Sequence, residues 1–133
     1  MSQVSSHPFT FSDKIDADYI YGMYENDYPY IESMFKAVVD HFDEDLATIR
    51  NNYAQNNIEL LRKSVHKVRP SFGFAGMPAV QEKCSEFENK CHAAKFINEL
   101  DADFQEFIKC LEEAGTVIIE EYKKLKSFNG ACS

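Results

Sequence analysis

The sequence predicts an all-α protein, an antiparallel up-and-down four-helix bundle with a short extra helix at its N-terminus. Three observations favour this fold. Apolar residues recur at every third or fourth position through most of the chain, which is the period of an amphipathic helix. The 133 residues include only 5 Gly and 4 Pro, too few for a turn-rich β fold. The breaks between periodic segments are short, so each helix can bury its apolar side only against antiparallel neighbours.

The length of the chain fits one domain with a substantial core, and 11 Phe and 7 Tyr suit a packed interior. Residues 1–12 show no period and are expected to form a loosely attached arm. Residues 13–127 are expected to form the bundle, and residues 128–133 a frayed tail.

Two helices are expected in the first half of the bundle. The first is short, at about residues 13–24. Asp27 is suited to cap the second, at about residues 28–54, because Pro29 then falls in its first turn. The acidic residues around Asp43 leave open a break within this second helix.

The third helix is expected at about residues 57–74. Asn56, with Glu59 three positions later, resembles a capping box at its start. Gly76 is expected to cap its end, and Pro78 to stand in the first turn of the next helix, so the chain reverses tightly between them.

Two more helices complete the prediction. The fourth is expected at about residues 78–95, and the last ends near Lys126. Either Asn98 or Asp101 is suited to cap the last helix. Gly115 lies inside it and costs about 1 kcal/mol relative to Ala, so a local bend is expected there.

The charge of the chain is uneven. The net charge is −8, which disfavours nucleic acid as a partner. Residues 62–83 nevertheless carry five bases and one acid, whereas the segments on both sides are acidic. A function that needs positive charge is therefore expected within this one basic segment.

The cysteines fit a reducing cytosol. They form no C-x-x-C pair, and buried thiols are the expected state for two or three of Cys84, Cys91, Cys110 and Cys132. No apolar run approaches the ~20 residues of a membrane helix, and the N-terminus does not resemble a signal peptide. A cytoplasmic, monomeric protein that does not bind membranes is the prediction.

His66 is the first candidate for chemistry. It lies about 120° from the centre of the apolar stripe of its helix, so its imidazole should be solvated. A neutral imidazole is a nucleophile near neutral pH and can accept a phosphoryl group. Cations one turn away would neutralise the transferred group. The plain alternative is a surface histidine without a role.

The run from His66 to Gly76 resembles the signature of histidine-containing phosphotransfer (HPt) domains, four-helix bundles that carry phosphate between receiver domains in phosphorelays. His66 matches the family's phosphorylated histidine, and Arg69 matches a basic residue that is usually lysine. The glycines seven and ten positions after the histidine are Gly73 and Gly76. The family's polar residue 22 positions after the histidine, often glutamine, is Glu88.

The resemblance extends over about residues 16–125 and implies a function. His66 would accept a phosphoryl group from a receiver aspartate and pass it to another receiver. Glu88 would hydrogen-bond the second ring nitrogen; the plain alternative is a solvated carboxylate that does not hold the ring. The partners would be receiver domains of response regulators and hybrid sensor kinases. The receiver would supply Mg²⁺, so no cofactor or metal is expected in this chain. The sequence contains no P-loop or kinase glycine loop, so no autonomous kinase activity is expected.

The neighbouring residues receive supporting roles. Arg69 and Lys67 are expected to offset the charge of the moving phosphoryl group, assisted by Arg62 or Lys63. A docking surface of small residues is expected from Pro70, Gly73 and Gly76. Pro70 departs from the family, in which glycine is usual, and leaves the His66 carbonyl without its helical hydrogen bond.

Two alternatives remain from the sequence. The chain can be a non-catalytic helical module that binds a receiver or kinase without taking phosphate, which Pro70 leaves open. It can also be a metal-binding bundle, because the spacing along one helix is compatible with a cluster of Cys84, Glu88, Cys91 and His92.

Overall fold

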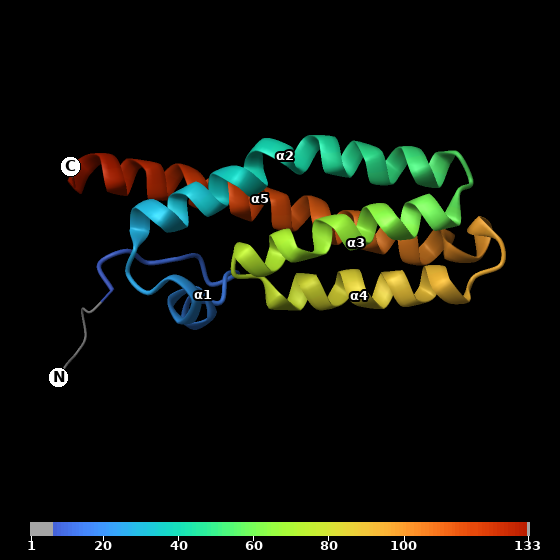
Figure 1. Cartoon of the computed structure of the whole chain (residues 1–133), viewed down its shortest axis with the longest axis horizontal. Coiled ribbons are helices and arrows are strands. Elements are labelled where there is room, and N and C mark those ends of the chain that lie inside the picture. The colour runs from blue at the N-terminus through green and yellow to red at the C-terminus, as the bar shows by residue number, and fades with distance from the viewer. Residues whose placement is uncertain (1–6, 133) are drawn as a thin grey trace.

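The computed structural model describes residues 7–132 and forms an up-and-down bundle of four long helices (Figure 1). These described residues contain no strand. The short α1 and a 3-10 turn, η2, accompany the bundle, and the elements in chain order are α1 (Ala17–Tyr24), α2 (Tyr28–Ala54), α3 (Ile58–Phe74), α4 (Pro78–Ala93), η2 (Ile97–Leu100) and α5 (Asp101–Cys132). The predicted fold class is confirmed.

The core lies between the four long helices. Figure 1 shows α2 and α5 extending past α3 and α4 at the end where α1 packs. Each helix contributes the apolar side that its spacing predicted. Among the most deeply buried side chains are Ile20, Ile31, Phe35, Ile49, Leu61, Val65, Phe72, Cys84, Leu111, Ile118 and Leu125.

Side-chain caps determine where the first two helices begin. Asp16 accepts a hydrogen bond from the Tyr19 N–H at 3.0 Å, so α1 begins at Ala17, four residues later than expected. Asp27 caps α2 as predicted, accepting from the Tyr30 N–H at 3.2 Å. α2 is continuous past Asp43, so the possible break there is not present.

The cap of α3 was predicted one residue too early. Asn57 caps the helix, because its side chain accepts from the Leu60 N–H at 3.0 Å. Asn56 instead adopts a φ of 59°, a left-handed conformation that asparagine tolerates in turns. Glu59 is in the first turn of α3, but its carboxylate pairs with Arg62.

The turn between α3 and α4 requires Gly76. Its φ is +75°, and the Met77 N–H donates to the Phe72 carbonyl at 2.7 Å, which closes the end of α3 in a Schellman motif. A Cβ at position 76 would lie 2.6 Å from the side chain of Ile20. Gly76 therefore serves both the backbone conformation and the packing of α1 against this turn.

The last helix differs most from the prediction. Asn98 lies within η2, and Asp101 is the first residue of α5, so neither precedes the helix as the expected cap. Glu99 accepts from the Phe96 N–H at 2.8 Å at the start of η2. α5 then continues to Cys132, so residues 128–132 are helical rather than frayed, whereas Ser133 lies outside the described residues. α5 is also continuous through Gly115.

Two sequence features around the bundle have packing explanations. A Cβ at Gly115 would lie 2.4 Å from the ring of Phe42, so the glycine makes room for that ring.

Residues 1–6 of the expected arm lie outside the described residues, but the segment after them is not loose. Phe9 and Phe11 are buried, and Phe9 packs edge-on against Phe128 at 5.4 Å between ring centroids.

The buried Glu121 fastens the same N-terminal segment to α5. Its Oε1 accepts from the Ser12 N–H at 2.9 Å, and its Oε2 pairs with Lys124 at 2.9 Å. Only 3% of Glu121 is exposed, and both of its oxygens have partners, as a buried carboxylate requires.

No described helix is both long and apolar enough to span a membrane.

Candidate functional site

His66 lies near the middle of α3 with its ring largely in solvent. It falls outside the buried stripe of that helix, which comprises Leu61, Val65, Val68 and Phe72. The side chain of His66 is 60% exposed. The solvated position predicted from helical spacing is therefore what the structure shows.

Glu88 of α4 holds one nitrogen of this ring. Nδ1 of His66 lies 2.8 Å from Oε1 of Glu88, a hydrogen-bond distance. Glu88 is only 9% exposed and lies on the side of α4 that packs on α3. A charged carboxylate only accepts, so Nδ1 of the neutral ring carries the hydrogen and Nε2 carries the lone pair. Nε2 is thus the ring nitrogen that remains free to accept another group.

Arg69 is close to the same carboxylate but does not extend freely into solvent. Its Nη1 donates to the Ser85 hydroxyl at 2.9 Å and forms an ion pair with Oε2 of Glu88 at 3.0 Å. The second contact lacks the angles of a hydrogen bond, so its contribution is electrostatic. His66, Arg69, Ser85 and Glu88 thus form one connected polar group across α3 and α4.

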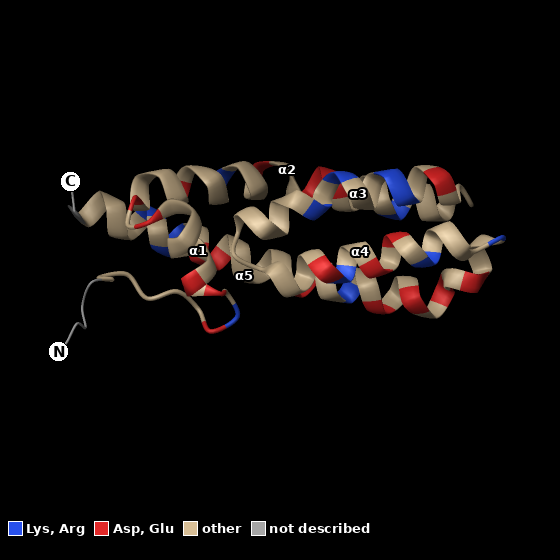
Figure 2. Ribbon diagram, turned by 60° about the horizontal axis from the view of Figure 1, so that its bottom comes forward, with Lys and Arg blue, Asp and Glu red and all other residues tan. Residues whose placement is uncertain are grey.

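The other predicted cations differ in how tightly they are held. Arg62 is half-buried and donates to Glu59 at 2.7 Å. The exposed lysines form only long pairs, Lys63 at 3.9 Å from the same carboxylate and Lys67 at 3.8 Å from Asp45 of α2. Figure 2 shows basic residues as blue bands along α3. Exposed pairs like those of the two lysines contribute ~0–1 kcal/mol each, so Lys63 and Lys67 remain available to an arriving anion.

The small residues predicted for docking are divided between surface and core. Pro70 is exposed inside α3, one turn after His66. Gly73 and Gly76 are both buried, which corrects the expectation that they lie on the surface beside the histidine. A Cβ at Gly73 would lie 2.9 Å from the amide of Gln81, so Gly73 accommodates that α4 side chain.

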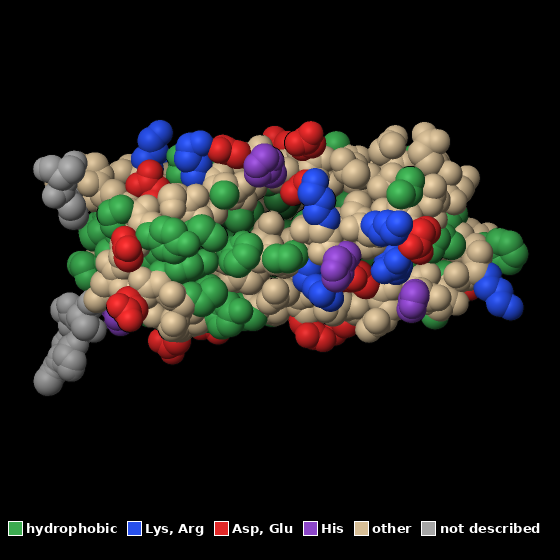
Figure 3. Space-filling view, viewed as in Figure 1, with side chains coloured by type: hydrophobic (Ala, Val, Ile, Leu, Met, Phe, Trp, Pro, Cys, Tyr) green, Lys and Arg blue, Asp and Glu red, His purple; other side chains and the backbone are tan. Residues whose placement is uncertain are grey.

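A surface hollow beside the histidine includes α2 residues that were not predicted. It has a volume of about 320 Å³ and is lined by Met34, Ala37, Val38, His41, Asp45, Lys67, Ser71 and Phe74. Figure 3 shows hydrophobic side chains next to the basic region on the same face of the molecule. Helical spacing within α3 carries no signal for this hollow, because it depends on which part of α2 lies alongside.

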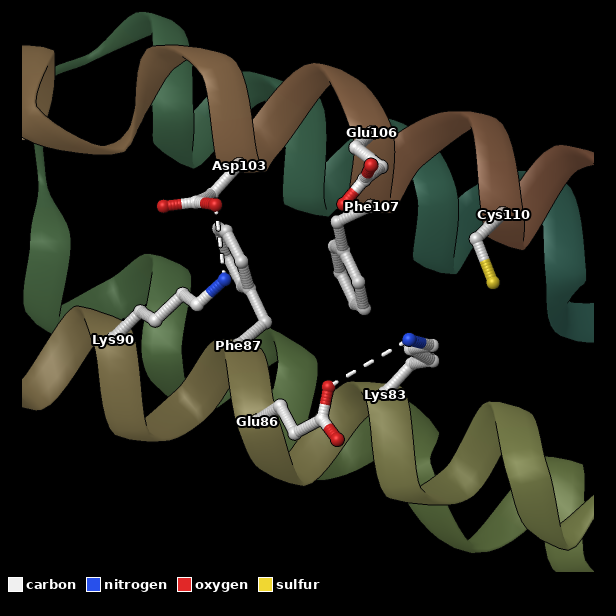
Figure 4. A pocket seen from close by; sticks show the side chains of 8 residues that line it. All are labelled: Lys83, Glu86, Phe87, Lys90, Asp103, Glu106, Phe107 and Cys110. Atoms are coloured by element: carbon white, nitrogen blue, oxygen red, sulfur yellow. Dashed lines mark hydrogen bonds and ion pairs between the residues drawn. The ribbon is translucent and has the colours of Figure 1, made fainter.

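A second surface hollow, of about 160 Å³, lies between α4 and α5 (Figure 4). The rings of Phe87 and Phe107 stack within it at 4.5 Å. Lys90 pairs with Asp103 at 2.9 Å across it. The charges along this hollow are thus largely paired with one another, and the hollow lies on the α5 side of α4, whereas Glu88 faces α3.

The cysteines of α4 are core residues. Burial raises the pKa of Cys84 to about 12 and that of Cys91 to about 11, so both remain thiols at neutral pH. Zinc binds the thiolate form, which this burial disfavours. Over the described part of the chain, no group of three or more His, Cys, Asp or Glu side chains is placed to hold a metal ion.

Comparison with known proteins identifies the class to which this fold and site belong. The family model of the Hpt domain matches residues 33–118, which include all of α3 and α4, and the chain belongs to this family. Membership supports a general role in histidine phosphotransfer within phosphorelays and in interaction with receiver domains.

A solved structure gives the same fold. The crystal structure of the HPT domain from the Hpt sensor hybrid histidine kinase of Shewanella aligns with a TM-score of 0.72. The alignment covers 84% of this chain and 95% of that one at 17% sequence identity, so the likeness concerns the fold alone. No curated protein matches the sequence.

Proposed function

We propose that this chain is a phosphorelay intermediate in the cytoplasm, in which His66 accepts a phosphoryl group from a receiver-domain aspartate and passes it to a second receiver. The observation that supports this most directly is the pair formed by His66 and Glu88. It combines an exposed ring with a fixed hydrogen bond of 2.8 Å at Nδ1. A surface histidine without a role has no need of a buried carboxylate behind it.

The transfer step follows from the state of the ring. The lone pair of Nε2 attacks the phosphorus of the aspartyl phosphate, an N–P bond forms, and the P–O bond to the aspartyl carboxylate breaks. The released carboxylate keeps the bonding electron pair. Nδ1 retains its hydrogen, so the phosphorylated ring is positively charged. The Glu88 carboxylate then offsets that charge, and the reverse step restores the neutral ring.

Surface cations of the chain support the approach of the phosphoryl group. Phosphoryl transfer depends mainly on positioning and on neutralising charge. Lys63 and Lys67 are mostly exposed, and each lies at least 3.8 Å from its nearest carboxylate. The receiver contributes its own Mg²⁺ and most of the remaining groups.

The direct test is to incubate the protein with a panel of phosphorylated receiver domains and to map the label. We expect an acid-labile, base-stable label on His66 that is lost in His66→Gln. His92→Gln is the matched control, because His92 is an exposed histidine of α4, and it should be labelled like the wild type.

Two results would select another function. Full labelling of His66→Gln would show that the acceptor lies elsewhere. Binding of a receiver with equal affinity by the wild type and by His66→Ala, without any label on either protein, would identify a non-catalytic interaction module.

A further inference from the structure

Arg69 is turned toward α4, although its sequence position suggested a direct contact with the phosphoryl group. Its Nη1 lies 2.9 Å from the Ser85 hydroxyl and 3.0 Å from Oε2 of Glu88. Its side chain is 32% exposed, about half the exposure of Lys63 or Lys67. One guanidinium nitrogen is thus shared between two groups of the neighbouring helix.

Glu88 needs such a partner. A carboxylate that is 9% exposed loses most of its hydration, and this loss must be offset by hydrogen bonds or an opposite charge. One oxygen accepts from His66, and the other is buried without a hydrogen bond. The charge of Arg69 is the compensation at that second oxygen.

We propose that Arg69 and Ser85 are positioning residues for the phosphotransfer histidine and act through Glu88. Ser85 orients the guanidinium, and the guanidinium fixes the carboxylate and offsets its charge. The carboxylate then keeps the ring in the Nδ1–H tautomer with Nε2 free. This inference rests on the proposed function and changes one assignment within it, because the charge of the phosphoryl group is left to Lys63 and Lys67.

Positioning through Glu88 and direct contact with phosphate differ in their dependence on the carboxylate. If Arg69 acts through Glu88, its removal should matter little once the carboxylate has become an amide. If Arg69 contacts the phosphoryl group, its removal should matter equally in both backgrounds. A double-mutant cycle of Arg69→Ala and Glu88→Gln separates the two, because residues that act as a unit are not additive.

The experiment measures the rate of transfer from a phosphorylated receiver to the full chain. Arg69→Ala alone should slow transfer on the order of ten-fold, because the buried Oε2 of Glu88 then loses the charge that compensates it. In the Glu88→Gln background the same change should slow it by less than about two-fold. Arg50→Ala is the matched control, an arginine of α2 that pairs with Glu112 of α5 instead, and it should leave the tautomer unchanged.

Nitrogen-15 NMR of the His66 ring gives a readout that general destabilisation would not mimic. The wild type should show the Nδ1–H tautomer, and Arg69→Ala should shift the ring toward a mixture with the Nε2–H form. Ser85→Ala is a milder variant for the case in which Arg69→Ala does not fold, and it should shift the ring in the same direction. Arg69→Lys should restore the tautomer in part, since lysine keeps the charge without the planar fork.

Three outcomes are decisive. Equal slowing by Arg69→Ala in both backgrounds, or an unchanged tautomer in a folded Arg69→Ala protein, would overturn the positioning role. Non-additive slowing together with the tautomer shift would establish it. Absence of any label on the wild type would refute the proposed function instead, while the NMR comparison would still decide whether Arg69 and Ser85 hold the ring.

Discussion

Pro70 lies inside α3, and its replacement with alanine should stabilise the protein. Proline supplies no N–H for the His66 carbonyl, and its ring crowds the preceding turn. In a helix interior this costs up to about 3 kcal/mol relative to alanine. The missing hydrogen bond alone accounts for about 0.5–1.5 kcal/mol. Because Pro70 is exposed, water can reach this side of the helix, and the expected gain is about 1–3 kcal/mol.

Urea denaturation measures this gain. With a slope of about 2 kcal/mol per molar urea, a gain of 2 kcal/mol moves the midpoint by about 1 M. Pro70→Gly is the matched variant, because it restores the N–H but lacks the helix propensity of alanine. It should be about 1 kcal/mol less stable than Pro70→Ala. If both variants are no more stable than the wild type, proline is not a cost at this position and the reasoning fails.

The remaining predictions concern a packed glycine and a buried thiol. Gly115→Ala should destabilise the protein by up to about 2 kcal/mol, because the cost of displacing the Phe42 ring exceeds the gain in helix propensity. Gly22→Ala, at a helical site with open space around it, should instead stabilise the protein by about 0.5–1 kcal/mol. Thermal denaturation measures both variants, and equal melting temperatures would contradict this explanation. The folded protein holds the pKa of Cys84 near 12, against 9.0 for an ordinary thiol, so its contribution to stability is complete below about pH 9 and is lost as the pH rises toward 12. Ionisation of this thiol in the unfolded chain should lower the free energy of unfolding by about 1.4 kcal/mol between about pH 8 and about pH 10. Cys84→Ala should remove that part of the measured fall in stability, and an unchanged slope would refute the assignment.

The bundle was predictable because its helices are amphipathic and its breaks carry local signals. Asp27 and Pro29 fix the start of α2 through short-range capping, which a sequence displays directly. The choice between Asn56 and Asn57 was not predictable in this way. Both residues are competent caps, and the outcome depends on which one adopts the left-handed turn conformation.

The N-terminal segment could not be predicted from periodicity. Phe9 and Phe11 belong to an irregular segment, so no helical or strand period identifies the side that they bury. Their burial depends on partners more than a hundred residues away, such as Phe128 and the Glu121 carboxylate that accepts from Ser12. Helix propensity and hydrophobic periodicity describe residues close together in the sequence, so they do not predict such contacts.

The candidate site was predicted in its composition and less well in its geometry. Gly73 was expected in the docking surface beside His66, but helical spacing describes one helix and omits the Gln81 side chain that covers Gly73 from α4. The same limit applies to Arg69. Its position three residues after the histidine suggested solvent, and the deciding contact is Ser85 on the other helix.

One geometric rule connects the cross-helix contacts of the site. In an antiparallel helical hairpin, residues equally distant from the turn lie at the same height, because both helices rise about 1.5 Å per residue. In each α3–α4 pair of the site, the two residues lie equally far in the sequence from Met77, which is in the turn that Gly76 permits. The pairs are His66 with Glu88, Arg69 with Ser85, and Gly73 with Gln81.

The separation of 22 positions between His66 and Glu88 is therefore a property of a hairpin with this turn. One residue inserted after Gly76 would rotate α4 by about 100° relative to α3 and shift it by about 1.5 Å. Glu88 would then no longer reach His66, and the contact between Ser85 and Arg69 would also be lost. The Schellman turn at Gly76, although it is buried and remote from the ring, is thus a condition for the polar group that holds His66.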